Sequence, residues 1–142
     1  MLKGQAVASL PMEVKVPVNL YINKMYLLIT ATFCKGKDVG EFVIHYKDGK
    51  IARIPLTLGE NIKDWWNPKV LPHARVAWMG NSSKHSPVGI YMIKWINPFK
   101  TNRVKTIKFI AEDKTGPQLV WIAATVEQTN PARFTELGAE KK

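Results

Sequence analysis

Cysteine is almost absent from the chain, which contains Cys34 and no other. A single thiol cannot form an internal disulfide, and it excludes a zinc site built on paired thiolates. Cys34 follows an apolar run and has no Cys-plus-His motif around it. We therefore expect a half-buried small residue rather than a reactive thiol.

Long apolar runs are also missing. The longest, such as Met25–Thr30 and Leu119–Val126, are far shorter than the roughly 20 residues that a membrane-spanning helix needs. Met1–Val7 lacks the apolar stretch of a signal peptide. The sequence therefore predicts no membrane insertion, and by itself it indicates no compartment.

No recognised catalytic pattern appears in the chain. The 11 acidic residues are scattered, without the paired carboxylates of a glycosidase. The three histidines, His45, His73 and His85, lie too far apart in sequence for a local metal motif. A Gly-x-Ser-x-Gly elbow, a phosphate loop and a dinucleotide fingerprint are all missing. We expect no enzyme activity and no cofactor.

Arginine is scarce, with 4 residues against 17 lysines, although the net charge is +10. Nucleic-acid binders usually gather such charge into a stripe or arm and favour arginine for bidentate phosphate contacts. Here the cations lie singly along the chain, often at the polar positions of alternating segments. This pattern favours a solvated basic surface over a nucleic-acid interface, and it leaves attraction to an acidic polysaccharide open.

What the chain does have is the composition of one globular domain. Its 142 residues are 46% hydrophobic and include five Trp, four Tyr and five Phe, enough to build a single core. We predict one domain over residues 1–129, followed by a polar tail or linker over 130–142.

Alternation of apolar and polar residues recurs throughout, whereas a helical period does not persist. The pattern predicts an all-β antiparallel sandwich of jelly-roll type. The expected strands are Val14–Val18, Met25–Phe33, Glu41–Tyr46, Ile51–Leu56, Arg75–Met79, Gly89–Ile96, Arg103–Ile110 and Leu119–Val126.

Two of these strands and one of the turns between strands carry further information. Val14–Val18 contains a proline and is expected at a sheet edge. Met25–Phe33 is almost wholly apolar and β-branched, which is typical of a central strand covered on both faces. The Asp48-Gly49 pair between two alternating runs predicts a hairpin.

Two segments lack strand character. Gly59–Pro72 is the longest, and one short helical turn is expected within it, at Ile62–Trp66. The polar tail is expected to form a brief helix around Ala132–Leu137.

The segment around Trp65 and Trp66 has both ingredients of a sugar-binding site, since Asn61 and Asp64 accompany the rings. Sugars lay an apolar ring face on an aromatic side chain, while polar groups bond their hydroxyls. The alternative is that these rings fill or cap the core, as tryptophans in sandwiches more often do.

Two of the other tryptophans are expected to be structural, and the third has two possible orientations. Trp95 and Trp121 lie within strands and are predicted to pack in the core. Period-two alternation places Trp78 on the inner face with Arg75 outside, unless the chain turns near the strand end and exposes the ring. The polar loop with His85 is either a recognition loop or a solvated turn.

The order of these motifs resembles a known family. Tyr26–Thr32, Val39–Gly49, Gly59–Trp66 and Val88–Pro98 together resemble galactose-binding-like β-sandwich modules, which occur beside bacterial glycoside hydrolases. The resemblance implies a jelly roll that binds carbohydrate through loops at one end, and an extracellular or periplasmic location. Some relatives hold a structural calcium, for which Asp38 and Glu41 are the available candidates here.

The sequence thus leads to three functional hypotheses. The first is a non-catalytic carbohydrate-binding module, an accessory domain that binds an oligo- or polysaccharide beside a catalytic domain of its parent protein. The second is a structural or protein-interaction module, and the third, which is less favoured, is a nucleic-acid-binding domain. The candidate ligand-binding residues are Asn61, Asp64, Trp65, Trp66, Arg75 and His85.

Overall fold

Eight strands make up most of the described chain. The structure is a computed structural model, and it describes residues 11–83, 87–112 and 117–134. The elements are β1 (Glu13–Leu20), β2 (Ile22–Thr32), β3 (Asp38–Tyr46), β4 (Ile51–Thr57), β5 (Arg75–Gly80), β6 (Val88–Ile96), β7 (Val104–Ala111), β8 (Gln118–Gln128) and the 3-10 helix η1 (Pro131–Arg133). All eight expected strands are present, and their ends lie within a few residues of the predicted ones.

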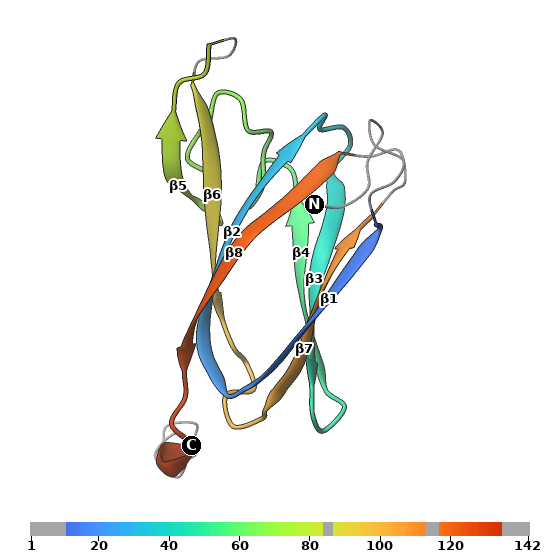
Figure 1. The fold of residues 1–142 in the computed structure, drawn as a ribbon, viewed down its shortest axis with the longest axis vertical. Helices are drawn as coiled ribbons and strands as arrows, with labels where there is room; N and C mark the ends of the chain where they lie inside the picture. Colours follow the sequence, from blue (N-terminus) through green and yellow to red (C-terminus); the bar gives the residue numbers. More distant parts are fainter. Residues whose placement is uncertain (1–10, 84–86, 113–116, 135–142) are drawn as a thin grey trace.

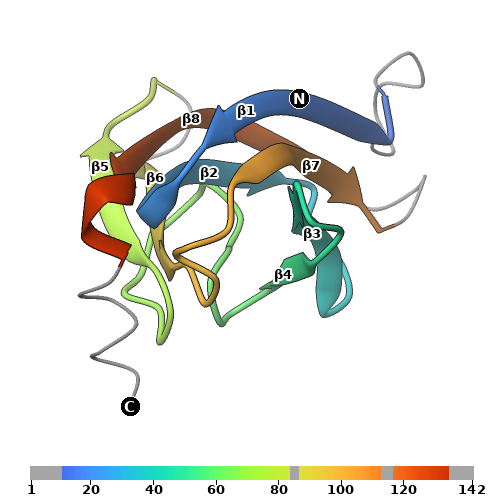
Figure 2. The ribbon, with the colours of Figure 1, turned by 90° about the horizontal axis from the view of Figure 1, so that it is seen from below.

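The strands form two four-stranded sheets that pack face to face (Figure 1 and Figure 2). One sheet has the order β1-β7-β3-β4 and the other β5-β6-β2-β8, and every neighbouring pair is antiparallel. This arrangement confirms the predicted sandwich. The predicted edge position of β1 is also confirmed, since β1 pairs with β7 alone and places Pro17, which has no N–H to donate, in an edge strand.

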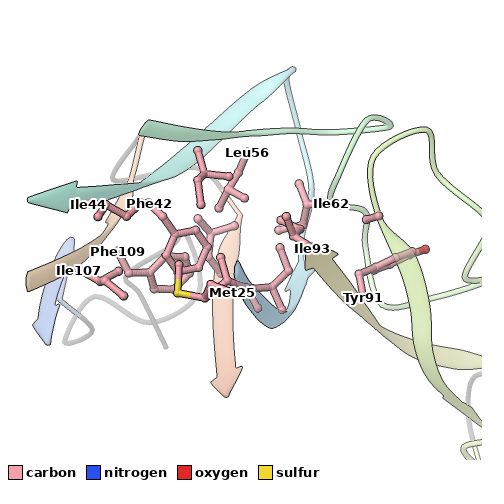
Figure 3. Close-up of a cluster of buried hydrophobic side chains, with 14 of the residues drawn as sticks. Met25, Phe42, Ile44, Leu56, Ile62, Tyr91, Ile93, Ile107 and Phe109 are labelled. Atoms are coloured by element: carbon pink, nitrogen blue, oxygen red, sulfur yellow. The ribbon is translucent and has the colours of Figure 1, made fainter. Parts of the chain in front are cut away.

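The core lies between the sheets and is built from the inward-facing half of each strand (Figure 3). Phe42 and Phe109 stack with ring centroids 4.7 Å apart, and Trp121 meets both rings edge-on. Trp95 and Trp121 are both partly buried against this cluster, which confirms their predicted structural role. Each fully buried Leu, Ile or Phe stabilises the fold by about 1.5–3 kcal/mol relative to an exposed one.

The central position predicted for β2 is confirmed, but its expected cover on both faces is wrong. The strand lies between β6 and β8 and alternates between buried and half-buried residues. Met25, Leu27 and Ile29 face the core, while Tyr26 and Leu28 are only partly covered. Among the described residues no third layer of strands covers the outer face, so neighbouring side chains shield the apolar run there.

The Asp48-Gly49 hairpin is present between β3 and β4. Gly49 has a φ of 95°, a left-handed conformation that glycine adopts without a steric penalty. The Asp48 carboxylate accepts a hydrogen bond from the Lys50 backbone N–H at 3.0 Å, and the Tyr46 N–H donates to the Lys50 carbonyl. The turn therefore forms as the sequence predicts.

The helical turn predicted at Ile62–Trp66 is wrong, because this segment runs extended and joins the sheet. The Trp65 N–H donates to the Ala31 carbonyl at 2.9 Å, and the Gly89 N–H donates to the Trp65 carbonyl at 2.8 Å. These backbone bonds to β2 and β6 replace the internal bonds of a helix. In the tail, η1 begins after Asn130, while residues 135–137 of the expected helix lie outside the described residues.

A buried polar cluster joins the two sheets near the β3–β4 turn, at the end of the sandwich opposite the Trp65 segment (Figure 1). The Tyr46 hydroxyl, on β3, donates to the side-chain oxygen Oδ1 of Asn97, which lies just after β6. The Asn97 amide nitrogen donates to the Ile22 carbonyl at 2.7 Å, and its oxygen accepts from the Phe99 N–H at 2.9 Å. Asn97 is 1% exposed, so all these groups depend on one another for partners.

Replacement of Tyr46 and replacement of Asn97 should destabilise the fold by different amounts. Tyr46→Phe should cost about 1 kcal/mol, because Asn97 keeps its other partners. Asn97→Leu should cost about 3 kcal/mol or more, because it leaves the Tyr46 hydroxyl, the Ile22 carbonyl and the Phe99 N–H buried without partners. Urea unfolding of the three proteins checks the order; equal losses would contradict it.

Stability should also fall in alkaline solution. Burial, together with the Asp48 charge, raises the pKa of Tyr46 above its ordinary value of 10.0. The folded state then keeps a proton that the unfolded chain releases, so the free energy of unfolding decreases as pH rises above about 10. Denaturation at several pH values checks this, and Tyr46→Phe should show a shallower decrease than the wild type.

Candidate functional site

One open pocket gathers aromatic and polar side chains at the end of the sandwich where β2 finishes and β8 begins. We call it the end pocket; its volume is about 700 Å³. Three chain segments line it, contributing Thr32, Phe33, Cys34, Lys35, Asp64, Trp65, Trp66 and Gln118. Because these segments join strands of the sandwich, the core fixes their spacing.

The first wall comes from the residues that follow β2. Phe33 adopts a φ of 55°, a left-handed conformation that is unusual for a bulky residue. The chain turns there, and the Phe33 side chain is left 57% exposed. A strained backbone that presents an aromatic ring to solvent is a pointer to a binding role.

The second wall is the extended segment that carries the two tryptophans. The Asp64 carboxylate accepts a hydrogen bond from the Trp66 N–H at 3.2 Å, and Lys63 donates to the carbonyls of Trp66 and Asn67. Ile62 is fully buried and anchors the segment in the core (Figure 3). The loop is therefore held in one shape before any ligand arrives.

The two tryptophans differ in exposure. Trp66 is 43% exposed, whereas Trp65 is half-buried and its backbone is held between β2 and β6. Trp66 is thus the better placed of the two to lay a ring face against a ligand.

Gln118 forms the floor of the end pocket and carries an unusual feature. It is 6% exposed, and its amide oxygen lies 3.4 Å from the Thr32 hydroxyl. Its Nε2 has no hydrogen-bond partner among the described residues. A buried donor without an acceptor costs about 1–3 kcal/mol, and a ligand in the pocket would reach this buried nitrogen only after the side chain rotates.

The charges in the pocket are balanced and its thiol is unreactive. Lys35 and Asp64 supply one charge of each sign. Burial raises the pKa of Cys34 to about 12, and the nearby Asp64 carboxylate adds to the effect through its charge and a hydrogen bond. The thiol therefore stays protonated at neutral pH, and its half-buried position agrees with the sequence prediction.

The structure brings together three of the six predicted site residues, namely Asp64, Trp65 and Trp66. Asn61 lies at the base of the loop instead, where its amide accepts from the Thr57 N–H at 2.9 Å and donates to the Pro55 carbonyl at 2.7 Å. Arg75 is exposed and lines a separate pocket of about 450 Å³. His85 lies outside the described residues.

Trp78 is exposed rather than inward-facing, because β5 contains a bulge. Val76 pairs with Tyr91 and Trp78 pairs with Ile90, so β5 has one extra residue, Ala77, at this point. A bulge shifts the alternation by one position and re-aims the next side chain. Trp78 is 55% exposed as a result, on the edge strand of its sheet.

Sequence reasoning missed the other residues of the end pocket, chiefly Phe33, Lys35 and Gln118. The sequence predicted Phe33 as the last residue of a buried strand, and the turn is evident only from its left-handed backbone in the structure. Gln118 precedes an apolar strand, and no local signal distinguishes it from a solvated loop residue. Their proximity to Asp64 follows from strand order, which one sequence does not specify.

The described parts of the chain hold no group of three or more His, Cys, Asp or Glu that would suit a metal ion. Of the two calcium candidates, Asp38 is within 3.3 Å of the Thr57 hydroxyl and Glu41 pairs with Arg53. Over residues 11–83, 87–112 and 117–134, no helix has the length and apolar character to span a membrane.

No protein-family model matches the chain, and no curated protein matches it.

Removal of the unpartnered amide should raise stability. Gln118→Met keeps the length and much of the shape of the side chain but deletes Nε2, so we expect the free energy of unfolding to increase by about 1 kcal/mol. Thermal unfolding checks this. Thr32→Val serves as the control. It removes the hydroxyl of the weak Thr32–Gln118 contact but leaves the amide in place, so it should not increase the free energy of unfolding.

Proposed function

We propose that the chain is a non-catalytic carbohydrate-binding module and that the end pocket holds the sugar. The observation that carries the proposal is the combination, in one open pocket, of the exposed Trp66 and Phe33 rings with the unpartnered Gln118 amide. A sugar ring offers an apolar face for the aromatic side chains and hydroxyls for the polar groups.

The chemistry of the pocket suits an uncharged sugar unit. Hydroxyl groups both donate and accept, so one can accept from the Gln118 amide after a small rotation while another donates to Asp64. The balanced charges of Lys35 and Asp64 impose no strong preference for an ion at this site. The loop is already held by backbone bonds, which lowers the entropy cost of binding.

The location of the pocket supports the finer assignment to a galactose-binding-like jelly roll. The resemblance in sequence implies ligand binding by loops at one end of the sandwich, and the end pocket lies at such an end. As part of the same proposal, the chain serves as an accessory domain of a larger extracellular or periplasmic protein that processes polysaccharides.

Affinity electrophoresis over a panel of neutral polysaccharides tests this function. We expect retardation by at least one glycan, and Trp66→Ala should weaken the binding by about 1–3 kcal/mol with little change in melting temperature. Trp78→Ala is a matched control, because Trp78 is comparably exposed but lies outside the end pocket.

Two results would contradict the proposal. The first is that no glycan retards the folded wild-type protein. The second is that Trp66→Ala and Trp78→Ala weaken the binding equally, which would show that the end pocket is not the binding site.

A second candidate function is a protein-interaction module. The observation that favours it is the edge strand β5, which exposes Trp78 (55%) and Met79 (54%) side by side in sequence. Exposed apolar residues on an unpaired edge are typical of docking surfaces. Two observations would support this function: self-association of the chain, or its binding to a separately produced neighbouring domain. In either case Trp78→Ala should abolish the interaction.

A further inference from the structure

A second cluster of charged side chains lies on the outer face of the β1-β7-β3-β4 sheet, away from the end pocket. A hollow of about 320 Å³ is lined there by Lys15, His45, Tyr46, Lys47, Gly49, Lys105, Thr106 and Lys108. We call it the cationic hollow. It is nearer the β3–β4 turn, at the opposite end of the sandwich from the close of β2 (Figure 1).

Strand register concentrates the lysines. Lys15 on β1 pairs directly with Lys108 on β7, and Lys108 pairs with Val43 on β3, whose other partner is Arg53. Directly opposite side chains in a sheet lie about 5 Å apart, and like charges in that position destabilise the pair. Glu13 offsets part of the repulsion through an ion pair with Lys108 at 3.2 Å.

A β-bulge adds a third lysine to the hollow. On β3, His45 and Tyr46 are adjacent, yet their partners on β7 are Thr106 and Val104, so Lys105 is the extra residue. Without the bulge, Lys105 and Thr106 would point to opposite faces of the sheet, whereas both line the hollow. Bulges of this kind are common beside functional sites.

The electrostatic environment of His45 shows the same concentration of charge. Burial lowers the pKa of His45 below its ordinary value of 6.5, and the charges of Lys108, Lys15 and Arg53 lower it further against the opposing effect of Glu13. None of the residues that line the hollow carries a carboxylate. The hollow thus combines a cross-strand pair of lysines, a β-bulge and an excess of positive charge.

We infer that the cationic hollow is a second binding site, which takes a sulfate or carboxylate group carried by an acidic polysaccharide. The anion relieves the repulsion between Lys15 and Lys108 that the folded chain otherwise bears. The identity of the carrier as a glycan rests on the proposed function, whereas the anion site rests only on the residues of the hollow.

A glycan fits the hollow better than a nucleic acid does. Two rings line the hollow. The Tyr46 ring is buried and offers no face on which a base can stack, and the second ring, the imidazole of His45, is itself partly buried. Arg53 is already paired with Glu41 and Lys108 with Glu13, so the cations of the hollow that are directed at a ligand are chiefly Lys15, Lys47 and Lys105. Duplex nucleic acid presents one negative charge per about 1.7 Å of its axis, so the proteins that bind it spread their cations along a surface. A hollow instead suits a single charged group that projects from the ligand.

The test is binding of heparin, as a sulfated glycan, and of polygalacturonate, as a carboxylated one, at several salt concentrations. We expect one or both to bind the wild type, with affinity that falls as salt rises. Lys15→Gln/Lys105→Gln should bind roughly tenfold more weakly or worse, as the loss of two charge contacts implies. The melting temperature should not fall, because the substitution relieves the Lys15–Lys108 repulsion.

A matched double variant, Lys37→Gln/Lys69→Gln, makes the same change in net charge at two exposed residues outside the hollow and should bind as the wild type does. Trp66→Ala should also keep its affinity for the acidic glycan, which separates this site from the end pocket. Two outcomes would show that the cationic hollow is not a binding site. In the first, Lys15→Gln/Lys105→Gln binds the acidic glycan as tightly as the wild type does. In the second, the two double variants lose the same amount of affinity.

Two further arms identify the ligand. Tighter binding of a single- or double-stranded oligonucleotide than of either glycan, at the same ionic strength, would overturn the assignment to a glycan. Free sulfate that displaces heparin at an equal concentration of sulfate groups would show that the site takes an isolated anion, and it would overturn the assignment to a polymer.

Discussion

The hydrogen bond between the Tyr46 hydroxyl and the Asn97 carboxamide is the contact on which the arrangement of the two sheets depends. Hydrophobic burial draws sheets together but does not fix their relative position, because it has no preferred direction. A buried hydrogen bond does fix it, since any sliding leaves a polar group without a partner. Asn97 extends this constraint to the start of β2 and to the connection before β7 through Ile22 and Phe99.

The opposite end of the sandwich depends on backbone bonds instead. Trp65 bonds to β2 through its N–H and to β6 through its carbonyl, so the loop is held as a short extra strand. Asp64 adds one side-chain contact, from its carboxylate to the Trp66 N–H, and both Asp64 and Trp66 line the end pocket. One end of the molecule is thus fixed by side chains and the other by main chain, and the proposed sugar site lies at the second.

Sequence reasoning predicted the strands and the sandwich, because alternation and the Asp48-Gly49 turn are local signals. It predicted the loop that carries Asp64 and Trp66 as well. It did not predict where Trp78 and Lys105 point, because a bulge moves a side chain to the other face and leaves no mark in the alternation. Nor did it predict that the scattered lysines meet, since their proximity depends on which strands pair.

The left-handed backbone at Phe33 places stability and recognition in opposition. Glycine at this position would relax the main chain, yet it would also delete one ring of the end pocket. Selection of this chain for heat resistance alone would therefore favour a substitution that removes one aromatic ring from the proposed sugar site. Natural sequences that keep a bulky aromatic residue at such a turn bear a thermodynamic penalty in every folded molecule, and recognition is the trait that would compensate for it.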